Sequence, residues 1–387
     1  MEENKLNFSK SKILKIVLFF IAVVCVAIVF SRYLTDDEFQ KEVDIKVFKK
    51  QIIESTSNTI EINSDSNPYI YAYSKYISVF GKNIFTIYDK DANVVTTLDM
   101  NITEPEMNSD ENYLVAYEKN GSKLYLVENT IKLWEKDIDG DIYRASVNKN
   151  GYVVALIKNS TYKSVVIIYD NSGNELFRTF LATSYAICSE ISEDNKYLAI
   201  GQIDYSGTIV KSVVKLISVE NVKGSSQDSI LYTYESEANK ILNNLKFNTK
   251  DEVICMFDSY IQKISGLSDE KICDITNEDI LVDVNLENNI VKVEKETSGL
   301  FSYQYQISLK NTIGKSDSMY VLENDIPKKM QVTKNLICVT LLNEVKIISS
   351  KGWLIKSYVT NTGIQDIVIG TNIVGIVYNN KIEIINT

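Results

Sequence analysis

The sequence predicts an all-β fold, a single β-propeller of about eight four-stranded blades, preceded by one N-terminal transmembrane helix. Three observations lead to this prediction. A pattern of short apolar strands and polar turns recurs between Tyr69 and the C-terminus at a spacing of roughly 35–55 residues, which brackets the period of about 40–50 residues typical of propeller blades. The middle strands of the repeats are apolar on both faces. An uninterrupted apolar run lies near the N-terminus.

The clearest copy of the repeat runs from Ile142 to Phe180. It contains four runs of strand-forming residues, at 142–147, 152–157, 164–169 and 176–180. The turn at 148–151 is Asn-Lys-Asn-Gly and the turn at 170–174 is Asp-Asn-Ser-Gly-Asn, and such residues punctuate antiparallel strands because they tolerate left-handed backbone angles. Comparable turns between a first and a second strand recur at 74–75, 109–112, 193–196, 248–251, 287–289, 333–335 and 370–372.

The composition of the middle strands favours a propeller over other β folds. Val153–Ile157, Val165–Tyr169 and Ile373–Val377 are apolar throughout. Antiparallel sheets with one wet face alternate apolar and polar residues, whereas blades packed against blades bury both faces of every sheet. A parallel α/β sheet also has two-sided apolar strands, but it needs crossover helices of a dozen residues or more, and most gaps here are turns.

The last copy of the repeat is incomplete, because the chain stops after Ile382–Ile385, its third strand. A propeller closes to hide its edges, since an unpaired strand edge invites aggregation. Thr59–Ile62, just upstream of the first full copy, is therefore expected to supply the missing outer strand. The weakest first strand is that of the second copy, near Thr103, which leaves seven blades as the alternative to eight.

The N-terminal apolar run, Ile16–Phe30, is predicted to cross a membrane. With its apolar flanks it approaches the length of about 20 residues that a spanning helix needs, and Lys15 and Arg32 can extend to the headgroups. Lysines at 5, 10, 12 and 15 precede the run, and acidic residues at 36–38 follow it. The positive-inside rule then predicts a single-pass protein of the cell membrane, with a cytoplasmic N-terminus and an extracytoplasmic propeller. A signal peptide cleaved near Val29-Phe30-Ser31 is the alternative.

The predicted boundaries are a cytoplasmic tail at 1–12, a transmembrane signal-anchor helix at 13–34, a linker at 35–57 and the propeller at 58–387. In the linker, Thr35 and Glu38 form a capping box that indicates a short helix. Val43–Val47 alternates like a strand instead, so the two patterns disagree about the structure of this segment.

Charge and composition exclude several function classes. The chain has a net charge of −10, and the part after Leu34, with 36 basic and 49 acidic residues, has a net charge of −13. Such a field repels nucleic acid, and no basic stripe offsets it, so no nucleic-acid partner is expected. The chain contains no histidine, which excludes a Ser-His-Asp triad, Cys-His catalysis and any histidine-ligated metal.

The cysteines and the acidic turns predict no disulfide, no metal site and no cofactor. Cys255 falls on a second strand and Cys273 on a fourth, and two strand spacings of about 9–10 Å are too wide for a disulfide. Isolated buried cysteines are expected to pack as small apolar residues. Asp89–Asn93 and Asp137–Asp141 resemble fragments of calcium loops, but both lack the sixth-position glycine and distal glutamate of an EF-hand.

Two sets of residues are candidates for ligand binding. Long loops between second and third strands place aromatic side chains on one rim, where they suit contacts with sugars or peptides, or instead cover the blade edges. These are Tyr162, Tyr205, Phe301 and Tyr303. The inner strands are expected to line the central channel with polar side chains, which any water-filled propeller also requires. These are Ser146, Glu190, Asn243, Asp283 and Asp366.

Two stretches resemble known propellers. Ile191–Ala199 resembles the S-x-D-G-K-Y-L-A step of many bacterial propellers, and Leu124–Val127 followed by Leu133-Trp134-Glu135 resembles the repeat of quinoprotein-like propellers, in which a tryptophan docks between blades. The Gly-His and Trp-Asp signatures of WD repeats are missing, and no residues match quinone ligands. As a whole, the chain resembles uncharacterised membrane-anchored propellers of clostridia-like Gram-positive bacteria, degenerate relatives of the quinoprotein-like and WD-like types. This implies a surface-exposed protein of unknown role.

The sequence favours a non-enzymatic function: a membrane-tethered binding or scaffold module for a protein or cell-envelope ligand. A sensory or assembly subunit that acts through a membrane partner is a second hypothesis, although Val23–Ala27 offers no G-x-x-x-G pairing face. The third is a propeller that binds or hydrolyses a glycan with channel carboxylates such as Asp283 and Asp366. Hydrolysis requires two carboxyl groups about 5–9 Å apart in one cleft.

Overall fold

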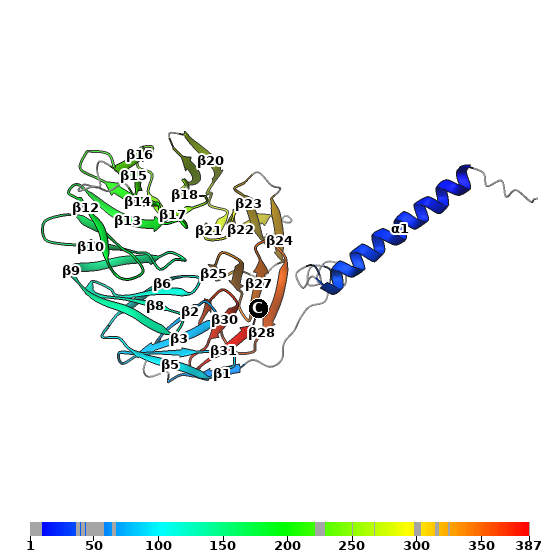
Figure 1. The fold of residues 1–387 in the computed structure, drawn as a ribbon, viewed down its shortest axis with the longest axis horizontal. Coiled ribbons are helices and arrows are strands. Elements are labelled where there is room, and N and C mark those ends of the chain that lie inside the picture. Colours follow the sequence, from blue (N-terminus) through cyan, green and yellow to red (C-terminus); the bar gives the residue numbers. More distant parts are fainter. Residues whose placement is uncertain are drawn as a thin grey trace, which may run out of the picture.

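The elements that the computed structural model describes include an N-terminal helix and a ring of antiparallel sheets (Figure 1). It describes residues 10–35, 39, 43, 58–63, 67–220, 229–249, 251–266, 268–297, 303–313, 317–323 and 326–386. Helix α1 spans Lys10–Thr35, and its segment Val17–Thr35 is long and apolar enough to cross a membrane. Most of the linker, including most residues of the capping-box and strand patterns, lies outside the described residues.

The ring has eight blades of four antiparallel strands each, as predicted. Blade 1 comprises β2 (Tyr69–Tyr73), β3 (Tyr76–Gly81), β4 (Ile84–Tyr88) and β5 (Val94–Asp99). Blade 2 comprises β6 (Pro105–Asp110), β7 (Tyr113–Glu118), β8 (Gly121–Glu128) and the first part of β9 (Ile131–Val147). Blade 3 takes the second part of β9, then β10 (Val153–Lys158), β11 (Ser164–Tyr169) and β12 (Glu175–Leu181).

The remaining blades follow in chain order around the ring. Blade 4 comprises β13 (Ser184–Ile191), β14 (Tyr197–Asp204), β15 (Lys211–Ser218) and β16 (Ile230–Glu235). Blade 5 comprises β17 (Leu242–Phe247), β18 (Glu252–Phe257), β19 (Tyr260–Ser265) and β20 (Ser268–Asp274). Blade 6 comprises β21 (Asp279–Asp283), β22 (Asn289–Thr297), β23 (Tyr303–Asn311) and β24 (Ser318–Glu323). Blade 7 comprises β25 (Lys329–Val332), β26 (Leu336–Thr340), β27 (Glu344–Ser349) and β28 (Leu354–Val359).

Strand β9 joins blades 2 and 3, because one continuous strand serves both. Its first part pairs with β8 through Ile131–Asp137, and its second part pairs with β10 through Asp141–Val147. Gly140 lies between the two parts with a φ of 134°, a conformation that residues with a side chain rarely adopt. A Cβ at this position would also lie 2.8 Å from the carbonyl oxygen of Lys158. Glycine is therefore required where the strand passes from one blade to the next.

The N-terminal strand closes the ring. Blade 8 comprises β29 (Asp366–Ile369), β30 (Ile373–Val377), β31 (Lys381–Asn386) and, as its outer strand, β1 (Asn58–Glu61). The pairing of β1 with β31 is antiparallel, with Ile60 opposite Ile382. The prediction that the segment from Thr59 supplies the missing strand is confirmed, and the first strand of blade 2, expected near Thr103, is Pro105–Asp110.

The hydrophobic core consists of eight clusters of buried side chains, one at each interface between neighbouring blades. Strand β10 shows how the sequence builds them. Val153, Ala155 and Ile157 pack towards blade 2, whereas Val154 and Leu156 pack towards blade 4. Because side chains alternate along a strand, a fully apolar strand fills the cores on both sides of its blade. This is the two-sided burial that the sequence predicts.

The tryptophan of blade 2 docks on the next blade, as its resemblance to quinoprotein-like repeats implies. The indole Nε1 of Trp134 donates a hydrogen bond to the carbonyl oxygen of Asn171, 3.2 Å away, in the turn between the last two strands of blade 3. Its ring lies 5.9 Å from that of Tyr169, also in blade 3. The contact therefore adds to the apolar interface between blades 2 and 3.

Candidate functional site

A central cavity of about 1,160 Å³ follows the axis of the ring. The first strands of all eight blades line it, together with the turns that connect first and second strands. We call the end of the ring that carries these turns the turn face. In antiparallel blades, the loops between second and third strands lie at the other end, the loop face. Because its lining includes the turns of blades 1 to 4 and 6 to 8, the cavity reaches the turn face.

Four of the five predicted channel residues line this cavity: Ser146, Glu190, Asp283 and Asp366. The fifth, Asn243, is exposed and does not line it, and its neighbour Asn244 does so instead. The register of β17 against β18 shifts between Leu242 and Asn244, so Asn243 is the extra residue of a β-bulge. After a bulge, each following side chain points to the opposite face of the sheet from the one that simple alternation predicts. The sequence pattern does not reveal the bulge.

The predicted rim aromatics pack against their own blades on the loop face. The ring of Tyr162 lies 4.7 Å from that of Phe180, and the ring of Tyr205 stacks 5.4 Å from that of Tyr185. Tyr303, half exposed, lies 3.6 Å from the ammonium nitrogen of Lys295. The fourth residue of this set, Phe301, lies outside the described residues. These tyrosines do not line the central cavity, so the aromatic set and the channel set belong to different ends of the ring.

Three partly buried charged groups, Glu190, Lys246 and Asp283, lie where the cavity passes blades 4, 5 and 6. Burial raises the pKa of Glu190 to about 7, although the backbone N–H of Phe247 donates a hydrogen bond to its carboxylate at 2.7 Å and Lys246 attracts it. Burial also raises the pKa of Asp283 to about 6. Lys246 donates to the carbonyl oxygen of Asn285, and burial lowers its pKa despite the attraction of both acids. Two acids that titrate near neutrality thus attract one partly buried lysine.

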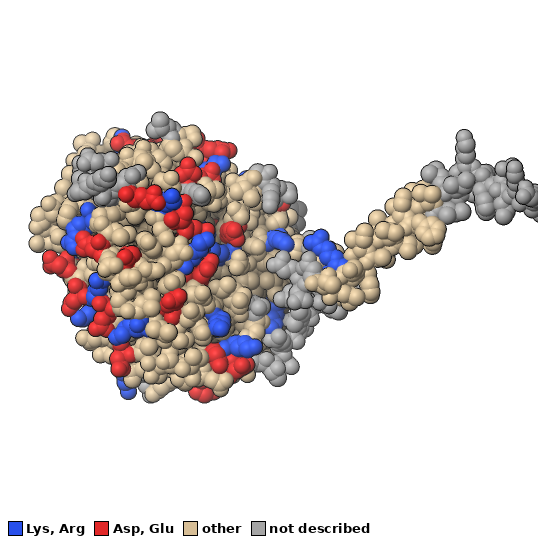
Figure 2. Space-filling view, in the orientation of Figure 1, with Lys and Arg blue, Asp and Glu red and all other residues tan. Residues whose placement is uncertain are grey.

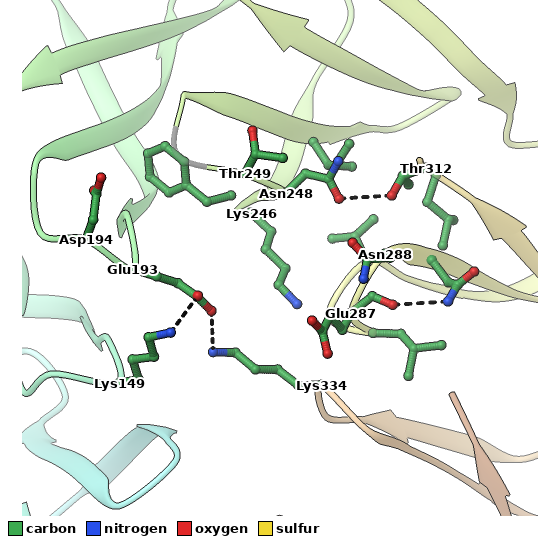
Figure 3. Close-up of a pocket in the computed structure, with 16 residues that line it drawn as sticks. Lys149, Glu193, Asp194, Lys246, Asn248, Thr249, Glu287, Asn288, Thr312 and Lys334 are labelled. Carbon is green, nitrogen blue, oxygen red and sulfur yellow. Dashed lines mark hydrogen bonds and ion pairs between the residues drawn. The ribbon is translucent and has the colours of Figure 1, made fainter. Parts of the chain in front are cut away.

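An ion-pair bridge crosses the turn face. The ammonium of Lys334 in blade 7 lies 2.9 Å from a carboxylate oxygen of Asp110 in blade 2 and 3.1 Å from one of Glu193 in blade 4. Glu193 also pairs with Lys149 of blade 3 at 2.7 Å (Figure 3). Burial opposes the charge of Lys334, but Asp110 and Glu193 outweigh it and raise its pKa. These four residues, the ring bridge, connect four blades.

A second space, the inter-blade pocket, opens between blades 5 and 6 and has a volume of about 410 Å³. Apolar side chains form part of its lining: Phe247, Ile254, Val284, Leu286 and Ile290. Amides and hydroxyls form another part: Asn248, Thr249, Asn288, Asn289 and Thr312. The pocket and the central cavity share five lining residues, all charged: Lys149, Glu193, Lys246, Glu287 and Lys334. Figure 3 shows these side chains converging from several blades.

Comparison with known proteins identifies the family and the fold. Residues 45–387 match the model of a family described as a family of unknown function, DUF5711. This chain belongs to that family. No curated protein matches its sequence.

Solved structures that resemble this DUF5711 protein are propellers. They include BamB from Moraxella catarrhalis, with 9% identity and a TM-score of 0.52, and the C-terminal WD40 domain of Sif2, with 10% identity and a TM-score of 0.53. Sqt1 from Chaetomium thermophilum has 11% identity and a TM-score of 0.53. Each similarity covers 86% of this chain and 99% of the other. At such low identities the similarity shows the β-propeller fold alone.

The lysines of the DUF5711 site were missed by reasoning from the sequence. Lys149 and Lys334 stand in turns that the repeat pattern locates, but a lysine in a polar turn is ordinary. Their significance comes from partners on other blades, since Lys334 and Asp110 are 224 residues apart. Lys246 follows the bulge of β17, so the alternation of residues in the sequence does not show that its side chain faces the cavity. The one sequence feature that could have indicated these ion pairs is that turns of opposite charge occur on different blades of a closed ring.

Proposed function

We propose that this DUF5711 protein is a membrane-tethered, extracytoplasmic propeller that binds a protein or cell-envelope partner through its turn face and catalyses no reaction. The observation that carries the proposal is the convergence of two cavities on one face, at five charged side chains. Side chains of both signs at a concave mouth suit recognition of a partner with complementary charges. Figure 2 shows acidic and basic residues interspersed over the visible surface rather than gathered into a basic stripe.

In this proposal, helix α1 attaches the propeller to the membrane. No side chain in the apolar window of Val17–Thr35 is buried, as expected of a segment that meets lipid. Lysines before the apolar run and acidic residues after it favour a cytoplasmic N-terminus. In this arrangement the propeller meets its partner outside the membrane.

Cross-linking on intact cells tests the binding face and the topology together. A membrane-impermeant cross-linker is expected to capture a partner with the full-length wild type. Glu287→Lys reverses an exposed charge at the mouth of both cavities and is expected to abolish the capture. Glu237→Lys, an exposed residue between blades 4 and 5 at the loop face, is the matched control and should retain it. Equal capture by both variants contradicts a turn-face site, and capture only with a permeant cross-linker contradicts the topology.

A glycan ligand is the second candidate, and the raised pKa values of Glu190 and Asp283 favour it, because one acid protonated near neutrality is what glycosidic cleavage uses. The other acid named by the sequence, Asp366, pairs instead with Lys329. Incubation with purified cell-wall glycan distinguishes the two functions. Release of reducing ends that Glu190→Gln abolishes would establish hydrolysis, and binding without release would leave a glycan-binding propeller.

A further inference from the structure

The interface between blades 5 and 6 is the least filled of the eight. Among the residues that the structure describes, its cluster holds four buried apolar side chains and five partly buried ones, whereas each of the other clusters holds eight to fourteen buried ones. Three of those four, Ile254, Val284 and Ile290, also line the inter-blade pocket. The pocket thus lies where the other interfaces have core side chains. Protein interiors are close-packed, so an apolar cavity at this position leaves contacts that a ligand can complete.

The polar part of the lining is held in place by its own hydrogen bonds. The hydroxyl of Thr312 donates to the side-chain oxygen of Asn248 at 2.9 Å, which joins blade 6 to blade 5 across the pocket. The side chain of Asn289 donates to the carbonyl oxygen of Glu287 at 3.0 Å (Figure 3). Fixed amides above an apolar floor are the arrangement that orients a peptide backbone while a side chain enters the pocket.

Lys246 supplies the charge that selects the ligand. The pocket has three lysines, of which Lys149 and Lys334 belong to the ring bridge. Within the part of the chain that the structure describes, Lys246 forms no ion pair, and its ammonium donates to the carbonyl oxygen of Asn285. Figure 3 shows this side chain reaching into the space between Glu193, Glu287 and Lys334. An ammonium keeps further donors after one such bond, and a carboxylate is the partner that binds it most strongly.

We propose that the inter-blade pocket binds a peptide segment of the partner protein in which a large apolar side chain lies beside a carboxylate. The apolar side chain fills the space between blades 5 and 6, and the carboxylate meets Lys246. A volume of about 410 Å³ lies within the usual range of roughly 300–1,000 Å³ for ligand sites. The proposal rests on the proposed function and names the partner's chemistry. The carboxylate belongs to a chain terminus or to an acidic side chain.

Unlabelled, N-terminally acetylated peptides and the full-length protein in detergent test the proposal by isothermal titration calorimetry. Gly-Ser-Gly-Ser-Leu with a free C-terminus supplies a terminal carboxylate, and its C-terminal amide removes it. Amidated Gly-Ser-Leu-Asp-Ser-Gly supplies a side-chain carboxylate instead, and asparagine in place of its aspartate removes it. Serine in place of leucine in each peptide removes the apolar group. We expect saturable binding of one carboxylate peptide, at least about 10-fold tighter than of its counterpart without the carboxylate, and about 10-fold or greater loss with serine.

Two variants place the binding in the pocket. Lys246→Met removes the ammonium and should reduce the preference for the carboxylate to less than about 3-fold. Its control, Lys271→Met, changes an exposed lysine on the outer strand of the same blade. Thr249→Trp fills the exposed mouth and should abolish binding of every peptide, while Thr97→Trp on blade 1 should not. Because Thr249 and Thr97 are both exposed, these substitutions should leave the fold intact.

Two results overturn the proposal: no saturable binding of any carboxylate peptide, or binding that Lys246→Met and Thr249→Trp leave unchanged. Preference for the free C-terminus assigns the carboxylate to a chain end, and preference for the internal aspartate assigns it to a side chain. Cross-linked capture that Glu287→Lys abolishes, without peptide binding, would overturn the peptide ligand alone. If the wild type neither captures a partner by cross-linking nor binds any peptide, the proposed function is overturned as well.

Discussion

Burial controls the pKa values of three titratable groups that line the central cavity. Glu190 and Asp283 are partly buried in the wall of the central cavity, so their charged forms are disfavoured and their pKa values rise. Burial lowers the pKa of Lys246, because it also disfavours the charged form of the ammonium. The carboxyl groups of Glu190 and Asp283 therefore bind and release protons near neutral pH. Affinity for a charged partner is therefore expected to depend on pH in the range from about 6 to 7.

Replacement of Glu190 by glutamine tests this burial through stability. The pKa of Glu190 is about 7 in the folded state and near its ordinary value of 4.5 in the unfolded state, so the folded state holds more protons between these values. The contribution of this group to the free energy of unfolding therefore falls as pH rises from about 4.5 to 7, by up to about 3 kcal/mol. Glu190→Gln cannot titrate, so its stability should fall less over this range. Chemical denaturation at several pH values measures both slopes.

An exposed glutamate provides the control for that experiment. Glu287→Gln changes the same kind of side chain at the same face, where water solvates the carboxylate. Its profile of stability against pH should run parallel to that of the wild type. A Glu190→Gln profile that is also parallel would show that Glu190 has the same pKa in the folded and unfolded states, and the assignment of a neutral-pH proton to this site would be wrong.

At the scale of the element, strand β1 has the greatest consequence for the fold. It is short and comes before the rest of the ring in sequence, yet it covers the edge of β31 and completes blade 8. Ile60 is 3% exposed and packs among side chains of blades 8 and 1. The strand thus serves an edge and an interface at once.

Ile60→Ala is expected to lower the free energy of unfolding by about 2–4 kcal/mol, because it removes buried methyl groups and leaves a cavity. Thr59→Ala, on the exposed face of the same strand, should change it by less than about 0.5 kcal/mol. Denaturant unfolding followed by tryptophan fluorescence measures both. Equal effects of the two substitutions would mean that β1 does not close the ring in solution.

The elements could be predicted from the sequence because they depend on local patterns. Four-stranded copies, two-sided apolar strands and the closing strand near Thr59 all follow from the alternation and spacing of residues such as Val153–Ile157. The bulge at Asn243 could not be predicted, since no glycine marks it and the adjacent asparagines Asn243 and Asn244 are equally suited to the cavity-facing position. One extra residue is enough to exchange Asn243 for Asn244 in the cavity.

At the scale of the whole molecule, the site exists only because the ring closes. The sequence places Lys334 and Asp110 in turns of separate repeats, and nothing local relates them. In the ring, the first-to-second-strand turns of all blades meet around one axis, so side chains of blades 2 and 7 come into contact. The position of a turn within its repeat can be read from the sequence, but the partner of its side chain depends on the number of blades and on their tilt.

The ring bridge should therefore stabilise the closed molecule more than an ordinary surface ion pair does. The side chains of Lys334 and Asp110 are 29% and 17% exposed, so removal of the lysine leaves a poorly solvated carboxylate without its partner. We expect Lys334→Gln to lower the free energy of unfolding by about 1–2 kcal/mol. Lys329→Gln, in the same blade, breaks the pair with Asp366, in which both side chains are nearly half exposed, and should cost less than about 1 kcal/mol.

Hydrogen exchange shows whether the effect of Lys334 crosses the ring. The bridge connects the turn of blade 7 to those of blades 2 and 4, so Lys334→Gln should speed deuterium uptake at 110–112 and at 192–196 as well as at 333–335. Lys329→Gln should affect only blades 7 and 8, which its ion pair joins. If faster exchange in Lys334→Gln stays within blade 7, the bridge does not couple distant blades. The turn face would then be a set of independent turns rather than one surface.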